Sequence, residues 1–433
     1  MEADTFPRFK GPLVTKANTN KSHKLAKASA ILLFTLIGAF GGYQLARMID
    51  ETTTTGALET ILIAGLFIVV LALAYLLHII VHEAGHLVMG LATGYQFISF
   101  RIGSIMVIKE QGRLRLRRFS LAGTGGQCLL SPPDLVDGRV PYVLYNLGGV
   151  LANLTLAILC GIIAVVARFI AVSQVGESAP LWTTPSGAVA LFCTFSAIVG
   201  LALALMNGIP LSLSGVDNDG RNIVSASKSP EALRAFWIIM KSGEELARGS
   251  RLKDMPAAWF APPSSPEALT NPLIASVAVL SCQRLLDEGN IPEAAQSIRT
   301  HLNTSTGTLG IHRALLNIDL AFCEMMEGTR PESPEPFDKE TLRIAKAMHT
   351  NPSLLRARYA TALLVDHNPD EARVLREKFD RVAANYPYSA DLASERELMA
   401  RVDETAAARQ KPVNNKVGET DTNLLKEASY DGA

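Results

Sequence analysis

Residues 60–90 read TILIAGLFIVVLALAYLLHIIVHEAGHLVMG. The stretch contains no charged residue up to Val81, and about 20 apolar residues are enough to cross ~30 Å of hydrocarbon as a helix. Its apolar character continues beyond Val81, where an HEAGH sequence begins at His82. The stretch therefore predicts a membrane-crossing helix over about 58–90 that carries titratable side chains within it.

Three further stretches are long, apolar and almost free of charge, at about 28–48, 140–168 and 186–207. A cleaved signal peptide is a poor interpretation of the first, because a long polar segment precedes it and no small-residue cleavage site follows. Together with 58–90, these stretches predict about four transmembrane helices.

Composition excludes several classes of protein. The 433 residues include 41 Lys+Arg and 41 Asp+Glu, so a strongly basic nucleic-acid-binding protein is not expected. Hydrophobic residues make up 48% of the chain, which is consistent with several membrane spans. The five cysteines form no CxxC pair, so neither a disulfide framework nor a cysteine-based zinc knuckle is predicted.

Lys and Arg gather in segments that four spans would place on one side of a membrane. These segments are the tail 1–27, the loop 92–139 and the chain beyond the fourth span. Cytoplasmic loops carry an excess of Lys and Arg. We therefore expect a multi-pass protein of the cell membrane whose two termini and C-terminal domain are cytoplasmic, with the lipid bilayer as its surroundings.

The loop 92–139 contains alternating apolar and polar residues at 98–102 and 112–116, which predict short strands. The expected fold is thus an all-α polytopic membrane protein with about four transmembrane helices and a short β-containing cytoplasmic loop. An α-helical soluble domain follows it. We expect the membrane domain to occupy 28–225, after the basic tail 1–27.

The remaining chain divides by composition. Residues 226–271 are expected to be a connecting segment and a Pro-rich linker. Residues 272–404 show helical patterns, and the similar stretches 285–295 and 364–372 each combine a tight turn, a proline and Glu-Ala. A tetratricopeptide-like array and an irregular helical bundle both remain open. The tail 405–433 is polar and is expected to be disordered.

The HEAGH sequence is the strongest chemical signal in the chain. Its spacing places His82 and His86 on one face of a helix, where both imidazoles can bind one Zn²⁺, and Glu83 lies beside them as a candidate general base. Charged and imidazole side chains inside an apolar helix are costly unless they are paired, metal-bound or hydrated. His78, one turn earlier, either extends the ligand set or makes a hydrogen bond between helices.

A catalytic zinc site needs a third protein ligand. The fourth span is followed by Asn207-Gly208-Ile209-Pro210 and then by Asp217-Asn218-Asp219-Gly220. The proline and glycines are expected to end the helix and turn a carboxylate back toward the histidines. Either aspartate could supply the ligand, and both could instead belong to a solvated turn.

These features resemble the site-2 protease family of intramembrane zinc metalloproteases over about residues 55–225. The resemblance rests on HExxH in one span, Asn-x-x-Pro followed by Asp-Gly after a later span, and Gly148-Gly149-Val150-Leu151-Ala152-Asn153 in the third. It implies that Asp219 is the third metal ligand, and that Asn153 and Asn207 position the substrate. The chain departs from the family pattern at Gly149, where proline is common, and at Asn218, where leucine is common.

The resemblance implies hydrolysis of a peptide bond in or near a transmembrane segment of a membrane-anchored protein or peptide. A substrate helix would have to unwind, and the loop strands could pair with the extended substrate. They could equally be amphipathic loop strands without such a role. The C-terminal domain is expected to bind a protein partner. Two alternatives remain open: a catalytically inactive membrane adaptor, and a zinc-binding transporter or sensor.

Overall fold

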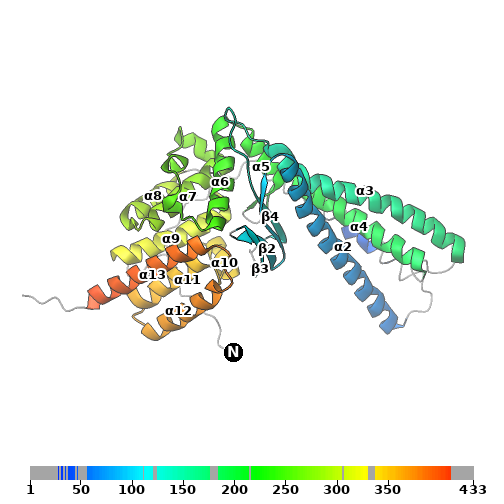
Figure 1. The fold of residues 1–433 in the computed structure, drawn as a ribbon. Helices are drawn as coiled ribbons and strands as arrows, with labels where there is room; N and C mark the ends of the chain where they lie inside the picture. Colours follow the sequence, from blue (N-terminus) through cyan, green and yellow to red (C-terminus); the bar gives the residue numbers. More distant parts are fainter. Residues whose placement is uncertain are drawn as a thin grey trace, which may run out of the picture.

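The computed structural model describes residues 56–110, 112–119, 124–175, 184–213, 216–304, 307–329 and 337–410, together with scattered positions between 28 and 46. Helices make up most of this part of the chain, and they are joined by a small antiparallel sheet. Figure 1 shows three long helices extending to one side. The helices of the C-terminal half form a body on the other side, with the sheet between the two groups.

The three long helices are α2 (Ala57–Ala92), α3 (Tyr142–Val175) and α4 (Pro185–Gly208). All three are long and apolar enough to cross a membrane. Large apolar side chains remain exposed on them, including Ile68 at 66% and Phe169 at 77%, which suits a hydrocarbon environment. These helices correspond to the second, third and fourth expected spans. The first, at 28–48, lies largely outside the described residues.

Helices α2 and α3 cross at two glycines. A Cβ atom added to Gly85 would overlap the carbonyl oxygen of Gly148, and one added to Gly148 would overlap the carbonyl oxygen of Gly85. Small residues let two helix backbones approach closely, which is a common way of packing helices in membranes. The crossing brings the middle of the HEAGH sequence directly against α3.

A four-stranded antiparallel sheet follows α2, with strand order β3-β2-β1-β4. Its edge strand β4 lies against both α2 and the later helix α6. The strands predicted at 98–102 and 112–116 fall within β1 and β3 or overlap them, and their period-2 alternation was a sufficient signal. The strands are β1 (Gln96–Ile102), β2 (Ile105–Glu110), β3 (Arg113–Arg118) and β4 (Gly126–Ser131).

Helix α4 ends at Gly208, and Pro210 follows it. The chain then makes the two-residue strands β5 (Ser212–Leu213) and β6 (Val216–Asp217), which pair with each other. Helix α5 (Asp219–Ala226) begins directly after them. The expected break after the fourth span is therefore present, and it turns the chain back toward α3 and α4.

The segment 226–271 differs from the expected linker because most of it is folded. Helix α6 (Pro230–Arg248) buries Phe236 and Ile238 in a core shared with the sheet and the next helix. Within the segment 226–271, prolines stand at the start of several helical turns, a position where proline is tolerated. Some of the prolines that suggested a linker therefore mark helix starts, namely Pro266 and Pro272, whereas Pro262 and Pro263 lie between two 3-10 helices. Three 3-10 helices follow: η2 (Leu252–Asp254), η3 (Ala257–Phe260) and η4 (Pro266–Thr270).

The C-terminal half is a packed set of helices with one extended apolar core. The two expected helix–turn–helix stretches are present: Gly289 lies in the turn before α8, and Asn368 caps the start of α12. The helices are α7 (Pro272–Asp287), α8 (Ile291–Asn303), α9 (Gly310–Glu327), α10 (Lys339–Ala347), α11 (Pro352–Leu364), α12 (Pro369–Ala383) and α13 (Ser389–Gln410).

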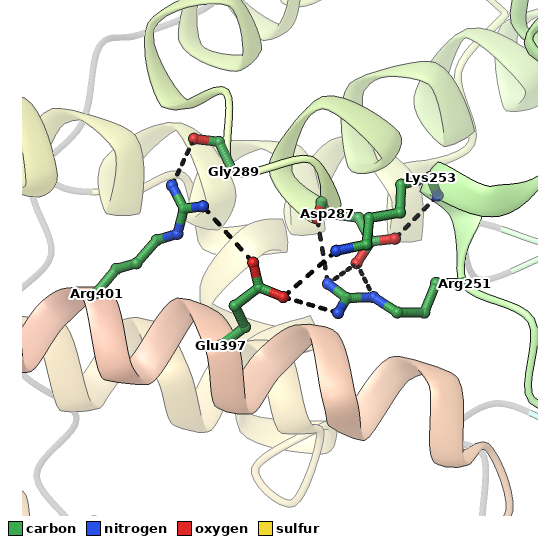
Figure 2. Close-up of polar contacts among 6 residues, drawn as sticks. All are labelled: Arg251, Lys253, Asp287, Gly289, Glu397 and Arg401. Atoms are coloured by element: carbon green, nitrogen blue, oxygen red, sulfur yellow. Dashed lines mark hydrogen bonds and ion pairs between the residues drawn. The ribbon is translucent and has the colours of Figure 1, made fainter.

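Helix α13 packs across this domain and is joined to its first helices by a polar network, shown in Figure 2. Arg251 contacts both Asp287 and Glu397, and Arg401 donates to the carbonyl oxygen of Gly289. The helix continues to Gln410, beyond the boundary expected at residue 404, because Val402 and Ala406 are buried against the domain core.

Candidate metal centre

The side chains of His82, His86 and Asp219 meet at one point between α2 and the start of α5. The two Nε2 atoms are 3.1 Å apart, and Asp219 Oδ2 lies 3.2 Å from His82 Nε2 and 3.4 Å from His86 Nε2. Bonds of about 2.0 Å to a tetrahedral zinc imply ligand–ligand distances of about 3.3 Å. The three atoms therefore match one face of such a coordination tetrahedron.

Helix α2 by itself brings two of the three side chains, His82 and His86, together. Residues four apart lie on the same helical face, so an unbroken α2 brings the two imidazoles together without any help from the rest of the fold. Their rings meet edge to face, with centroids 4.7 Å apart. The third ligand comes from a distant part of the chain, and only the tertiary structure places it.

Asp219 is held in place by the residue before it. The Asn218 side chain accepts from the backbone N–H groups of Leu211 and Arg221 and donates to the carbonyl oxygens of Met206 and Ile209. It thus caps the start of α5 and also satisfies carbonyl groups at the broken end of α4. Asn218 thus fixes the turn that presents Asp219.

The ring of His86 is oriented by the backbone of α3. Its Nδ1 lies 2.7 Å from the carbonyl oxygen of Tyr145. A carbonyl oxygen only accepts hydrogen bonds, so Nδ1 carries a proton, and Nε2, which points toward His82 and Asp219, is the nitrogen left to bind a metal. Metal-binding histidines are commonly oriented in this way.

The ring of His82 lies flat against α3. A Cβ atom added to Gly149 would overlap the imidazole, so only glycine leaves room for it. The Nδ1 atom of His82 lies 3.2 Å from Nδ2 of Asn153, one turn further along α3. Glycine at position 149 therefore accommodates the ring of a candidate metal ligand.

Glu83 lies beside these ligands and faces the sheet. It is 9% exposed, and a Cβ atom added to Gly126 would overlap its side chain. Gly126 is the first residue of the edge strand β4. The candidate general base is therefore located between the ligand group and the first residue of β4, a strand for which the described residues supply one pairing partner, β1.

The donor set fits a divalent cation. Asp219 Oδ2 is buried, and among the described residues it has no partner with hydrogen-bond geometry. Burial acts to raise the pKa of the Asp219 carboxyl, but the imidazoles of His86 and His82 outweigh it and hold the pKa at about 2. Two imidazole nitrogens and an ionised carboxylate are ligands that zinc accepts, so these residues suit a zinc ion.

The other expected site residues lie elsewhere or make different contacts. Asp217 is in β6 and hydrogen-bonds with Ser212, so of the two candidate aspartates the structure brings only Asp219 to the histidines. Asn207 donates to Leu203 O within α4. Asn153 is fully buried beside His82 and His78. His78 makes hydrogen bonds between helices, the second of the two interpretations given for it.

Sequence reasoning missed two contributors to the site, Tyr145 O and the Asn218 side chain. Asn218 had a readable signal, because asparagine directly before a helix is a preferred N-cap. The role of Tyr145 had no such signal, since any residue supplies a backbone carbonyl.

Comparisons of the chain with models of protein families, with curated proteins and with solved structures find no match.

Proposed function

We propose that the protein is a zinc-dependent endopeptidase that hydrolyses peptide bonds in or near transmembrane segments of membrane-anchored proteins or peptides. The observation that carries this proposal is the ligand group of His82, His86 and Asp219 with Glu83 beside it, at the end of a long apolar helix. The resemblance to the site-2 protease family supports the same activity. That resemblance rests on the motif residues alone.

The site residues suit hydrolysis of an amide bond. Zinc bound by the three ligands would supply a Lewis acid that makes water a nucleophile near neutral pH. Glu83 takes the proton from the attacking water and delivers it to the leaving amine. Its burial beside the ligands and away from bulk solvent favours this proton transfer over exchange with solvent.

The edge strand β4 offers a place for the substrate. Among the described residues it pairs with β1 alone, and it begins at Gly126, which lies against Glu83. A transmembrane helix hides its peptide bonds within its own hydrogen bonds, so a substrate must be extended before it is cut. Pairing of an unwound segment with β4 would satisfy its backbone and bring it alongside Glu83.

The bilayer location and orientation belong to the proposal. Helices α2, α3 and α4 are the candidate spans. The ligand group lies toward one end of these helices. Figure 1 shows that at this end the three helices adjoin the sheet and the C-terminal domain. With both termini in the cytoplasm, the site would open near the cytoplasmic surface, and the C-terminal domain would meet a protein partner there.

The test compares fragments of membrane proteins in cells that carry the wild type, Glu83→Gln or Glu377→Gln. The first variant removes the base and keeps all three ligands. The second changes an exposed glutamate of α12 and serves as the matched control. We expect one or a few single-span proteins to remain uncut only with Glu83→Gln, with zinc bound to all three proteins. Identical fragment profiles with zinc bound would overturn the proposal and favour the adaptor or transporter.

A further inference from the structure

A chain of buried polar side chains leads from the ligand group into the apolar interior between α2, α3 and α4. His78, Asn153 and Ser196 are each 0% exposed. His78 Nδ1 lies 3.1 Å from Asn153 Oδ1, and His78 Nε2 lies 3.2 Å from Ser196 Oγ. Polar groups in such surroundings are costly unless each one is paired, so this chain requires an explanation beyond helix packing.

The hydrogen bonds of this chain are coupled from end to end. To bind a metal through Nε2, His82 must carry its proton on Nδ1 and donate it to an acceptor. The neighbour of Nδ1 is the carboxamide of Asn153, which presents either Oδ1 or Nδ2 after a half-turn about its last bond. Only with Oδ1 toward His82 does His82 Nε2 keep its lone pair for the metal.

His78 decides which carboxamide orientation is satisfied. When Oδ1 of Asn153 faces His82, Nδ2 must donate to His78 Nδ1. His78 then carries its proton on Nε2 and donates it to Ser196 Oγ. The opposite orientation, with Nδ2 toward His82, is the one present in this structure. It makes His82 Nδ1 an acceptor and places the His82 proton on Nε2. The proton on His78 therefore selects the state of His82 through Asn153.

The rings have little freedom to leave this arrangement. A Cβ atom added to Gly200 of α4 would overlap the ring of His78, as one added to Gly149 would overlap the ring of His82. Both imidazoles thus lie directly on the backbone of a neighbouring helix. The two polar atoms of the Asn153 carboxamide are already engaged by the two histidines, and neither faces solvent.

We infer that Asn153 and His78 are positioning residues that set which ring nitrogen of His82 carries the proton, that a half-turn of the Asn153 carboxamide accompanies metal binding, and that Asn153 does not contact the substrate. The inference rests on the proposed metal site. It replaces the role in substrate positioning that the family resemblance implied for Asn153. It also excludes His78 as a ligand, because both of its ring nitrogens are engaged by Asn153 and Ser196.

The test measures Co²⁺ binding to the purified full chain in detergent, through the visible absorption of the bound ion and through competition with a chelator. We expect Asn153→Leu to weaken Co²⁺ binding by about 10- to 100-fold, the usual cost of losing an outer partner of a ligand. Asn146→Leu is the matched control, because Asn146 is equally buried on α3 and bonds only to Tyr142 O within its own helix among the contacts described. We expect that variant to bind Co²⁺ as the wild type does.

Asn153→Asp separates positioning from packing. A carboxylate accepts from His82 Nδ1 in either orientation, so this variant should restore Co²⁺ affinity and make His78 dispensable. His78→Leu should therefore weaken binding several-fold in the wild type and leave it unchanged in the Asn153→Asp background. Equal losses in both backgrounds would mean that His78 acts through packing, and would overturn the inference. A thermal melt of each variant reports any loss of folding separately.

The inference and the proposed function can fail separately. Wild-type Co²⁺ affinity and spectrum in Asn153→Leu, together with a raised KM for cleavage, would make Asn153 a substrate contact and overturn the inference alone. Co²⁺ binding that follows the expected pattern in a chain that cuts nothing would support the inference and overturn the peptidase. No Co²⁺ or Zn²⁺ binding by the wild type would overturn both.

Discussion

His82 Nε2 lies 3.2 Å from Asp219 Oδ2, although two complete helices, α3 and α4, separate these residues in the sequence. The contact joins the HEAGH helix to the turn that follows the last long helix. It depends on the α2–α3 crossing at one end and on the broken end of α4 at the other. Each of these supports can be tested.

The identity of the third ligand is tested with Asp219→Asn, using Asp217→Asn as the control. Asp219 supplies a charged ligand atom, so its loss should weaken zinc binding by more than the roughly 10- to 100-fold cost of losing an outer partner. Asp217, which bonds with Ser212 in β6, should be dispensable for binding. Zinc content after dialysis against a graded chelator checks this, and loss of zinc only in Asp217→Asn would reverse the assignment.

The glycine contact between α2 and α3 is tested with Gly148→Ala. The added methyl group meets the Gly85 backbone and cannot be accommodated by a side-chain shift, so we expect a loss of about 1–3 kcal/mol in the free energy of unfolding. Gly161→Ala lies on the same helix with open space around it. It should be neutral or slightly stabilising, since alanine favours a helix. Thermal unfolding in detergent distinguishes the two, and equal stability would argue against close contact.

The role of Asn218 is tested with Asn218→Ala and Asn218→Asp. Alanine removes the cap of α5 and should cost roughly 0.5–2 kcal/mol, with weaker zinc binding because Asp219 loses its fixed position. Aspartate keeps the two acceptor contacts and loses the two donor contacts, so we expect an intermediate effect. Ser227→Ala, at the other end of α5, is the control. Chelator competition measures the affinity for zinc, and thermal melts measure the stability. An Asn218→Ala variant that binds zinc as tightly as the wild type would contradict this account.

The network in Figure 2 predicts unequal effects at two of its cationic residues, Arg251 and Lys253. Arg251→Ala leaves the buried carboxylate of Asp287 without its charged partner and should cost about 3 kcal/mol. Lys253→Ala removes a longer and more exposed contact to Glu397 and should cost less than about 1 kcal/mol. Denaturant unfolding of the C-terminal half within the full chain, followed by near-UV circular dichroism, measures both. Similar costs would mean that the exposed pair contributes as much as the buried one.

Stability of the C-terminal domain should depend on pH through Glu395. Burial raises the pKa of this carboxyl to about 7, against an ordinary value of 4.5, although Arg356 acts in the opposite direction. The folded state then binds more protons than the unfolded state between these values, so the free energy of unfolding falls as pH rises from about 4.5 to about 7. Glu395→Gln should flatten this dependence.

A residual slope is expected in Glu395→Gln, because burial also raises the pKa of Asp391, to about 6. Asp370→Asn, at an exposed position of α12, should leave the whole profile unchanged. Melting temperatures measured across this pH range provide the check. A stability that rises with pH through the same window in the wild type would contradict the sign.

Local patterns in the sequence were sufficient for those features that depend on neighbouring residues. Apolar runs predicted α2, α3 and α4, alternation predicted strands in the loop, and the spacing within HEAGH predicted that His82 and His86 share a helical face. The same local reading misjudged 226–271, because proline at the start of a helix and proline in a linker look alike until the apolar face of α6 is seen to be buried.

The sequence by itself determined that three helices are long and apolar enough to cross a membrane, that two imidazoles are paired, and where Glu83 lies beside them, because the composition and periodicity of a helix fix these features within a few residues. Only the tertiary structure decided between Asp217 and Asp219, and only it placed Asn153 and His78 behind His82. These choices depend on contacts between helices, where a difference of two residues turns a side chain to another face. Such contacts are set by glycine-to-glycine packing and by the cap at Asn218, and no local pattern specifies them.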